Sequence, residues 1–227
     1  MSTDLHGYRR EYQGSALPPT LAEPWQLWQQ WFDQALAASR QGGQVEEPTA
    51  MVLATADAQG RPSARVVLCK AFGPQGFDFY SHAGSHKGRD LAENPQAALL
   101  FHWPALFRQV RVEGEVQVRP AAEAMAYWQQ RPLASQVAAV VSNQSQERDS
   151  RASLESDFAA RLAAADTATG VPVPEDWRGY RLVPRRFEFW QGLSNRLHDR
   201  LELTRVDPAG AGQDSADQRW ECRRLDP

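Results

Sequence analysis

The sequence predicts a mainly β fold, a small antiparallel barrel with helices on its outside. First, apolar runs at 50–55, 62–72 and 77–81 are joined by compact turns at 57–60 and 73–76. Such turns join antiparallel strands, since parallel neighbours need a long crossover. Second, strand patterns return at the C-terminal end after a helical middle section. Third, the chain has neither a repeating strand-helix-strand order nor a Gly-x-Gly-x-x-Gly motif, which argues against a Rossmann domain.

The N-terminal part divides into an arm and the start of a domain. Residues 1–23 are polar and contain Pro18-Pro19, so we expect an arm that is ordered only if something holds it. Pro24 suits a first helical position, and Trp25, Trp28 and Phe32 recur at helical spacing before Gly42-Gly43 ends the helix. The sequence therefore predicts an arm at 1–23 and one domain at 24–227.

The rest of the domain alternates between strand and helix patterns. A short helix at 85–93 has Ser85 as its N-cap and Asn94-Pro95 as its stop. Further strands are expected at 96–103, 107–118, 177–183, 186–191, 201–206 and 219–223, and helices at about 121–130, 135–142 and 150–165. In the strand at 107–118, alternation places Val110, Val112, Val116 and Val118 on the core face.

Composition narrows the class of protein. The 227 residues carry 25 Lys and Arg against 28 Asp and Glu, a net charge of −3, so no basic excess indicates nucleic acid. No stretch reaches the ~20 apolar residues of a membrane helix, and no signal peptide opens the chain. Two cysteines form no disulfide framework, so we expect a cytoplasmic protein that binds neither membrane nor nucleic acid.

Cationic side chains gather in three places that could bind phosphate. Arg65 and Lys70 flank an apolar run and are expected on opposite faces of one strand. Lys87 lies at a helix N-terminus, where free N–H groups favour an anion. Tyr127, Arg131 and Ser135 follow at four-residue spacing and share a face if the helix continues through Pro132. Any two of these three clusters would bind two phosphates, or one ligand of two parts.

The histidines favour no metal site. His82 and His86 are four apart, but no third ligand is evident, so no metal is expected. Arg196, His198 and Arg200 alternate along a predicted strand, which would put three cationic groups on one face. No Gly-x-Ser-x-Gly motif and no Walker loop are present.

Several motifs, taken together, resemble the pyridoxine/pyridoxamine 5′-phosphate oxidases. The C-terminal pair is Phe187-Glu188-Phe189-Trp190-Gln191-Gly192 followed by Arg196-Leu197-His198-Asp199-Arg200. The others are Arg65–Lys70, Phe79-Tyr80-Ser81 with Gly84-Ser85-His86-Lys87, Arg108-Gln109-Val110-Arg111, Arg131-Pro132-Leu133-Ala134-Ser135-Gln136, Ser142-Asn143-Gln144-Ser145 and the terminal Arg224-Leu225-Asp226-Pro227. The resemblance runs in order from Arg9 to the C-terminus without a large gap.

The resemblance implies a split antiparallel barrel that forms a homodimer with FMN at the interface. Arg65 and Lys87 would hold the FMN phosphate with Ser81 and, from the other subunit, Gln144 and Ser145. Gln109, Trp190 and Arg200 would line the isoalloxazine and ribityl region. The cofactor-binding residues implied in this way are Arg65, Val66, Val67, Leu68, Cys69, Lys70, Tyr80, Ser81, His86, Lys87, Gln109, Gln144, Ser145, Trp190 and Arg200.

It also implies the substrate and its site. Pyridoxine or pyridoxamine 5′-phosphate would be oxidised to pyridoxal 5′-phosphate, with dioxygen as acceptor and hydrogen peroxide as product. The substrate phosphate would be bound by Lys70, Tyr127, Arg131 and Ser135. Arg196 and His198, the implied catalytic pair, would meet the pyridine ring beside Leu197. The arm residues Arg9, Arg10, Glu11 and Tyr12 would form a lid over it.

Two departures from the family pattern and two alternatives remain. His86 stands where the family usually carries Arg, which predicts weaker, pH-dependent binding of the FMN phosphate. Phe107 replaces a commoner Glu or Asn, with no expected chemical effect.

Two alternative functions would share the fold. One is a binding protein that carries flavin or pyridoxal phosphate without turnover, and the other is a split-barrel flavin or deazaflavin reductase. The retained Lys70, Tyr127, Arg131, Ser135, Arg196 and His198 argue against both alternatives.

Overall fold

The computed structural model describes residues 11–41, 45–166, 168–206 and 219–227. The strands are β1 (Ala50–Ala56), β2 (Pro62–Leu68), β3 (Ala71–Gly73), β4 (Gly76–His82), β5 (Gln96–Trp103), β6 (Arg108–Val118), β7 (Trp177–Gln191), β8 (Asp199–Val206) and β9 (Arg219–Leu225). The helices are α1 (Trp25–Arg40), α2 (His86–Glu93), α3 (Ala121–Gln130), α4 (Leu133–Val141) and α5 (Arg151–Ala163), with short 3-10 turns η1 (Pro104–Leu106) and η2 (Ser194–Arg196).

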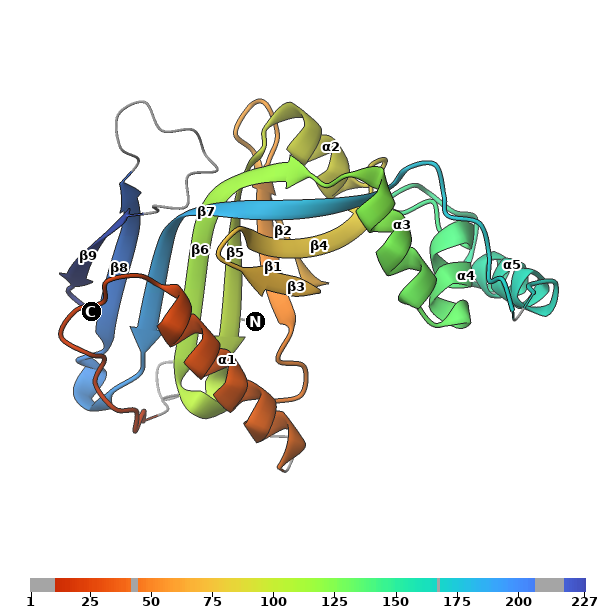
Figure 1. The fold of residues 1–227 in the computed structure, drawn as a ribbon. Coiled ribbons are helices and arrows are strands. Elements are labelled where there is room, and N and C mark those ends of the chain that lie inside the picture. Colours follow the sequence, from red (N-terminus) through yellow and green to blue (C-terminus); the bar gives the residue numbers. More distant parts are fainter. Residues whose placement is uncertain (1–10, 42–44, 167, 207–218) are drawn as a thin grey trace, which may run out of the picture.

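All strand pairs in the described residues are antiparallel, as the sequence predicts. The order is β2-β1-β5-β6-β7-β4-β3, and β8 pairs with β7 and β9. The long strand β7 carries β4 beside its first half and β8 beside its second half, while β6 runs along both. Figure 1 shows β7 bending over the molecule, with α3, α4 and α5 beyond its N-terminal end.

The bend in β7 explains why the sequence suggests two strands there. Glu113 of β6 pairs with Arg186 while the next residue, Gly114, pairs with Pro184, so Arg185 is left as a bulge. A bulge bends a strand and tolerates a proline without ending it. A Cβ at Gly114 would lie 2.0 Å from the Val183 carbonyl oxygen, so only glycine permits the close approach.

The core lies between the sheet and α1, which crosses the curled sheet (Figure 1). Trp28 of α1 is fully buried and packs edge-on against Phe77 and Phe101. Val110, Val112 and Val116 of β6 face this core as predicted, but Val118 is 63% exposed, because the strand has run past the edge of the core. Two predicted boundaries also shift: the run at 62–72 divides into β2 and β3, and β8 begins at Asp199.

The described part of the arm is docked against β8. The Leu17 N–H donates to Asp199 Oδ2 at 2.8 Å, and the Gly14 N–H donates to the Gly192 carbonyl at 3.1 Å. Arg224 bonds both Asp199 and the Pro18 carbonyl. Residues 11–18 are therefore held by groups from the C-terminal strands. No helix in the described ranges has the length and apolarity needed to span a bilayer.

Candidate active site

Lys87 is a buried cation at the N-terminus of α2. Ser85 caps this helix by accepting the Gly88 N–H, as the sequence predicts. Lys87 Nζ donates to Gln144 Oε1 at 2.7 Å, Ser81 Oγ at 3.0 Å and Ser85 Oγ at 3.4 Å, all neutral groups. Burial, helped by the nearby Arg65 charge, lowers the pKa of Lys87 to about 8. A buried cation with neutral ligands is a favourable place for an anion.

Arg65 lies near Lys87 and is held by three strand groups. Its guanidinium donates to the Leu53 carbonyl at 3.2 Å, to Thr55 Oγ1 at 2.7 Å and to Ser63 Oγ at 2.7 Å. Asp90 of α2 lies 3.8 Å from the guanidinium. Burial lowers the pKa of Arg65, which still stays charged at any physiological pH. The side chain is thus fixed before any ligand arrives.

A cavity of about 310 Å³ opens between these two cations. It is lined by Arg65, Val66, Val67, Leu68, Lys70, Tyr80, Ser81, Lys87, Tyr127 and Gln144. Every one of these residues is among those that the family resemblance implies for binding the cofactor or the substrate. Lys70 follows the end of β2, so the predicted arrangement of Arg65 and Lys70 on one strand is wrong, although both line the cavity.

A second cavity of about 310 Å³ shares Tyr80, Ser81 and Gln144 with the first and adds Arg131 and Ser135. The predicted phosphate clusters around Lys87 and around Arg131 are therefore neighbours. Tyr80 and Tyr127 stack at 3.9 Å between ring centroids. Arg131 lies over the Trp177 ring at 4.7 Å and donates to the Ser135 carbonyl at 2.8 Å.

The helix does not continue through Pro132, so the condition for Tyr127, Arg131 and Ser135 to share one helical face is not met. α3 ends at Gln130, Arg131 is extended, and α4 begins at Leu133. The reason is that proline disfavours a helical residue before it and lacks the N–H that a continuing helix needs. The break nevertheless turns Arg131 toward Ser135.

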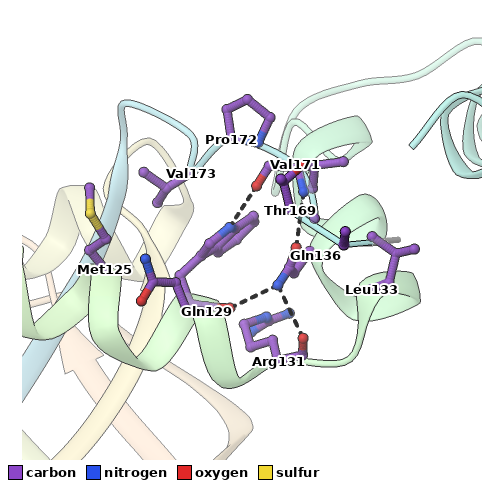
Figure 2. A pocket seen from close by; sticks show the side chains of 12 residues that line it. Met125, Gln129, Arg131, Leu133, Gln136, Thr169, Val171, Pro172 and Val173 are labelled. Atoms are coloured by element: carbon purple, nitrogen blue, oxygen red, sulfur yellow. Dashed lines mark hydrogen bonds between the residues drawn. The ribbon is translucent and has the colours of Figure 1, made fainter. Parts of the chain in front are cut away.

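A larger cavity, about 770 Å³, lies on another side of Arg131 and is shown in Figure 2. Gln136 crosses it: its amide donates to the Trp128 and Arg131 carbonyls, each at 3.1 Å, and accepts the Val171 N–H at 3.1 Å. Trp128 Nε1 donates to the Val171 carbonyl at 2.9 Å. These bonds tie the segment 168–173 to the break between α3 and α4, which indicates a structural role.

Some expected cofactor residues do not line the first cavity. The His86 ring is 59% exposed, and its Nε2 lies 3.4 Å from Asp90 Oδ1 on the same helix. Cys69 is buried beside Ala71, and burial raises its pKa to about 12. Ser145 is exposed with a φ of 69°. Gln144 contacts Lys87 and Ser81 within one chain, so its expected origin in the other subunit is wrong.

A second group of expected residues lies at the other end of β7. Trp190 and His198 have ring centroids 4.7 Å apart, and the Tyr12 ring packs edge-on against both, at 5.6 and 5.2 Å. The Leu193 N–H donates to His198 Nδ1 at 3.2 Å, so a neutral ring carries its proton on Nε2. Glu11 is exposed beside Tyr12. Arg9 and Arg10 lie outside the described residues.

The predicted strand through Arg196, His198 and Arg200 is wrong. Arg196 belongs to η2, and both Asn195 and Arg196 have left-handed backbone, with φ of 55° and 61°. Two consecutive non-glycine residues in this region are strained, and such strain concentrates at functional sites. Arg196 and Leu197 are exposed beside the half-buried His198. Gln109, Trp190 and Arg200 do meet as predicted, because Trp190 pairs with Gln109 on one side and Arg200 on the other.

The two groups are far apart within one chain. Ser81 pairs with Arg178 of β7, and Trp190 follows twelve residues later on the same strand. At ~3.3 Å per residue, that is about 40 Å of strand. A single chain therefore presents two partial sites.

Sequence reasoning missed the groups that hold Arg65. Thr55 Oγ1 donates to the buried Asp90 Oδ2 at 2.6 Å, and both contact the guanidinium. Asp90 lies one helical turn after Lys87, which is the signal that could have found it. Thr55 gives no such signal, because its partner on α2 is 35 residues away.

Comparison with known proteins assigns the chain to a family. The model of the pyridoxamine 5′-phosphate oxidase family matches residues 40–163, and that of the pyridoxine 5′-phosphate oxidase C-terminal dimerisation region matches residues 177–227. A Bordetella petrii protein named pyridoxine/pyridoxamine 5′-phosphate oxidase is 47% identical over 96% of this chain and 97% of its own length. The chain belongs to the pyridoxine/pyridoxamine 5′-phosphate oxidase family. A Ralstonia pickettii member of the same name is 46% identical over 99% of this chain and all of its own length.

Solved structures agree with this family and its fold. PhzG from Burkholderia lata, in complex with tetrahydrophenazine-1-carboxylic acid, has a TM-score of 0.81 at 30% identity, covering 95% of this chain and 100% of that one. A pyridoxamine 5′-phosphate oxidase-related, FMN-binding protein of Nostoc punctiforme has a TM-score of 0.67 at 17% identity, covering 94% and 100%. The fold is thus the split barrel of the family. The matched dimerisation region includes β7, β8 and β9, which supports a homodimer.

Proposed function

We propose that this protein is an FMN-dependent oxidase that converts pyridoxine 5′-phosphate and pyridoxamine 5′-phosphate into pyridoxal 5′-phosphate. Dioxygen would accept the electrons and leave as hydrogen peroxide, and the amine substrate would also release ammonia. The observation that carries the proposal is the pair of adjacent cavities that share Tyr80, Ser81 and Gln144. One has Lys87 and Arg65 as its cations, and the other has Arg131.

The residues present fit the phosphate of FMN. Lys87 is buried among neutral ligands, and Arg65 is preset beside it, so a phosphate dianion would compensate both charges. Ser81 and Gln144 would supply further hydrogen bonds. Bound there, FMN would supply the electron acceptor that the oxidation of an alcohol or amine requires.

The substrate phosphate would occupy the neighbouring cluster. Arg131 offers a guanidinium already oriented by Trp177 and the Ser135 carbonyl, while Lys70 and Tyr127 line the adjoining cavity. An anchored phosphate fixes where the rest of a small substrate lies, which lowers the entropic cost of reaching the reactive arrangement. These residues would therefore bind and orient the substrate.

The second group would complete the site from the partner subunit. Trp190, His198 and Arg200 are too distant along β7 to reach Lys87 of their own chain. A homodimer can place this face against the cavities of the other chain. His198, with its proton on Nε2, and Arg196 would then contact the pyridine ring, and the Tyr12 side chain would help exclude water.

Anaerobic titration of the purified flavoprotein tests this function. Pyridoxamine 5′-phosphate should bleach the flavin absorbance with formation of pyridoxal 5′-phosphate and ammonia, and admission of air should restore the absorbance with release of hydrogen peroxide. Pyridoxamine without its phosphate is the matched control and should act much more weakly, because Arg131 then has no anion to bind. A flavin that stays oxidised with both phosphorylated substrates would indicate a carrier protein or a different substrate.

A further inference from the structure

Glu188 is a buried carboxylate on the face of the sheet that lies opposite the core. It is 3% exposed, and its strand neighbours Phe187 and Phe189 point to the core. Because side chains alternate along a strand, Glu188 shares the outer face with Trp190. A carboxylate is rarely this buried unless it is paired.

Two guanidinium groups pair with this carboxylate. Arg111 of β6 contacts Glu188 Oε2 at 2.7 Å, and Arg200 Nε of β8 contacts Oε1 at 3.1 Å. The strand pairings explain the contacts, since Arg111 lies directly opposite Glu188 and Arg200 lies opposite Trp190. In the described part of the chain, Glu188 is the one carboxylate in an ion pair with Arg200.

The contacts continue as an alternating series of charges across three strands. Arg111 Nε lies 3.1 Å from Glu113 Oε1, and Arg186 Nη1 lies 3.4 Å from Glu113 Oε2. Arg186 Nε in turn lies 3.7 Å from Glu202 Oε2. Arg200 stands at one end of this series, where its Nη1 donates to the Asp226 carbonyl at 2.8 Å. Its orientation is therefore set by one charged group and one backbone carbonyl.

We propose that Glu188 is a positioning residue, which holds the Arg200 guanidinium in the orientation that contacts the bound flavin. This inference rests on the proposed function, because it takes the face of Trp190 and Arg200 to be flavin-binding. Without the carboxylate, two guanidinium groups would face each other across β7 and repel. Arg200 would then turn toward solvent, since it is already 26% exposed.

The test is a double-mutant cycle on FMN affinity, measured by the quenching of flavin fluorescence when apoprotein is added. Glu188→Gln keeps the side-chain shape and removes the charge, and we expect FMN to bind about tenfold more weakly, the scale of one charged hydrogen bond. In the Arg200→Ala background, the same substitution should have no further effect, because the group through which it acts is gone.

Glu202→Gln is the matched control, since Glu202 lies directly opposite Glu188 in the β7–β8 register and on the same outer face, but forms its ion pair with Arg186 rather than with Arg200. It should leave FMN affinity within about twofold of the wild type, below the scale of one charged hydrogen bond. If Glu188→Gln yields too little folded protein, Glu188→Asp is the second variant. Its shorter side chain should weaken FMN binding less, again only when Arg200 is present.

Two results would overturn the inference. One is an unchanged FMN affinity in folded Glu188→Gln, and the other is an equal loss with and without Arg200, which would show a general structural effect. A wild-type protein that fails to bind FMN at all would instead contradict the proposed function. If the protein fails to oxidise pyridoxamine 5′-phosphate but the effect of Glu188→Gln on FMN affinity still depends on Arg200, then the role of Glu188 stands. Only the proposed substrate is then contradicted.

Discussion

Lys87 Nζ and Gln144 Oε1 lie 2.7 Å apart, joining the first turn of α2 to the segment that follows α4. The two residues are 57 positions apart in sequence, and Ser81 of β4 contacts both. A neutral amide thus contacts the lysine at the wall of the cavity in which an anion would bind. This arrangement has consequences for both stability and binding.

Replacement of Lys87 by Met should stabilise the flavin-free protein while weakening FMN binding. Burial lowers the pKa of Lys87 to about 8, from a reference of 10.5, so the charged form costs about 3 kcal/mol at pH 7. Met removes this cost and also the main phosphate ligand. We expect a higher urea midpoint for the apoprotein and an FMN dissociation constant raised about 10- to 100-fold. A lower midpoint would show that the hydrogen bonds of Lys87 outweigh its desolvation.

The pH dependence follows from the same shift. Because the folded pKa of about 8 is below the unfolded value of 10.5, the unfolded apoprotein binds more protons between these values. The free energy of unfolding of the apoprotein should therefore rise as pH increases from about 8 to 10.5. Denaturant titrations at several pH values measure this rise. The Lys87→Met variant should lose this rise, and an equal rise in both proteins would assign it to another group.

FMN affinity should change in the opposite direction. A bound phosphate, with its second pKa near ~6, is a dianion throughout this range and favours the charged lysine. Affinity should be greatest below pH 8 and fall above it, with uptake of a proton on binding. Calorimetric titration in two buffers of different ionisation enthalpy measures that uptake directly. An affinity that is constant from pH 7 to pH 10 would exclude Lys87 as the phosphate ligand.

The sequence predicted the antiparallel fold because its signals are local. Turn residues at 57–60 and 73–76, and the alternation in β6, each fix a neighbouring pair of strands. It failed where a residue's place depends on distant contacts. The bulge at Arg185 joins two predicted strands into β7, and it exists because Gly114 lets β6 approach closely.

The site shows the same division. Local motifs identified Arg65, Lys87 and Arg131, and the structure places them in adjoining cavities. The alternation that predicted one face for Arg196, His198 and Arg200 missed the left-handed turn at Asn195 and Arg196. Asn is one of the non-glycine residues that adopt this conformation most often, but Arg196 gives no such indication. Gln144 was assigned to the wrong subunit, because no sequence pattern tells whether a contact lies within a chain.

Arg65→Ala and Arg196→Ala should separate cofactor binding from turnover. Arg65 lies in the cavity with Lys87, so its loss should yield mostly colourless protein and leave the buried Asp90 without its guanidinium neighbour. Arg196 lies in the exposed η2 turn of the second group, so its variant should stay yellow and lose turnover. Flavin content per chain and steady-state kinetics measure the two effects. Full flavin in Arg65→Ala, or equal flavin loss in both, would contradict these roles.

Gly192→Ala should release the arm. A Cβ at Gly192 would lie 2.6 Å from Tyr12 Cδ1 and 2.9 Å from Tyr12 Cγ, too close for the Tyr12 ring to stay in place. Tyr12 packs on Trp190 and His198, so its displacement should raise the KM for substrate several-fold while FMN stays bound. Faster chymotrypsin cleavage after Tyr12 would report the movement directly.

Gly73→Ala is the matched control for this substitution, because a Cβ there meets no heavy atom within 4 Å. The Gly73→Ala variant should be cleaved by chymotrypsin at the wild-type rate and should keep the wild-type KM. If Gly192→Ala is cleaved no faster than Gly73→Ala, then residues 11–17 are held by the Asp199 and Arg224 contacts rather than by Tyr12. If it is cleaved faster and the KM is unchanged, Tyr12 does not cover the substrate. Only the combination of faster cleavage and a raised KM supports a lid that is held over the substrate by the packing of Tyr12 against Trp190 and His198.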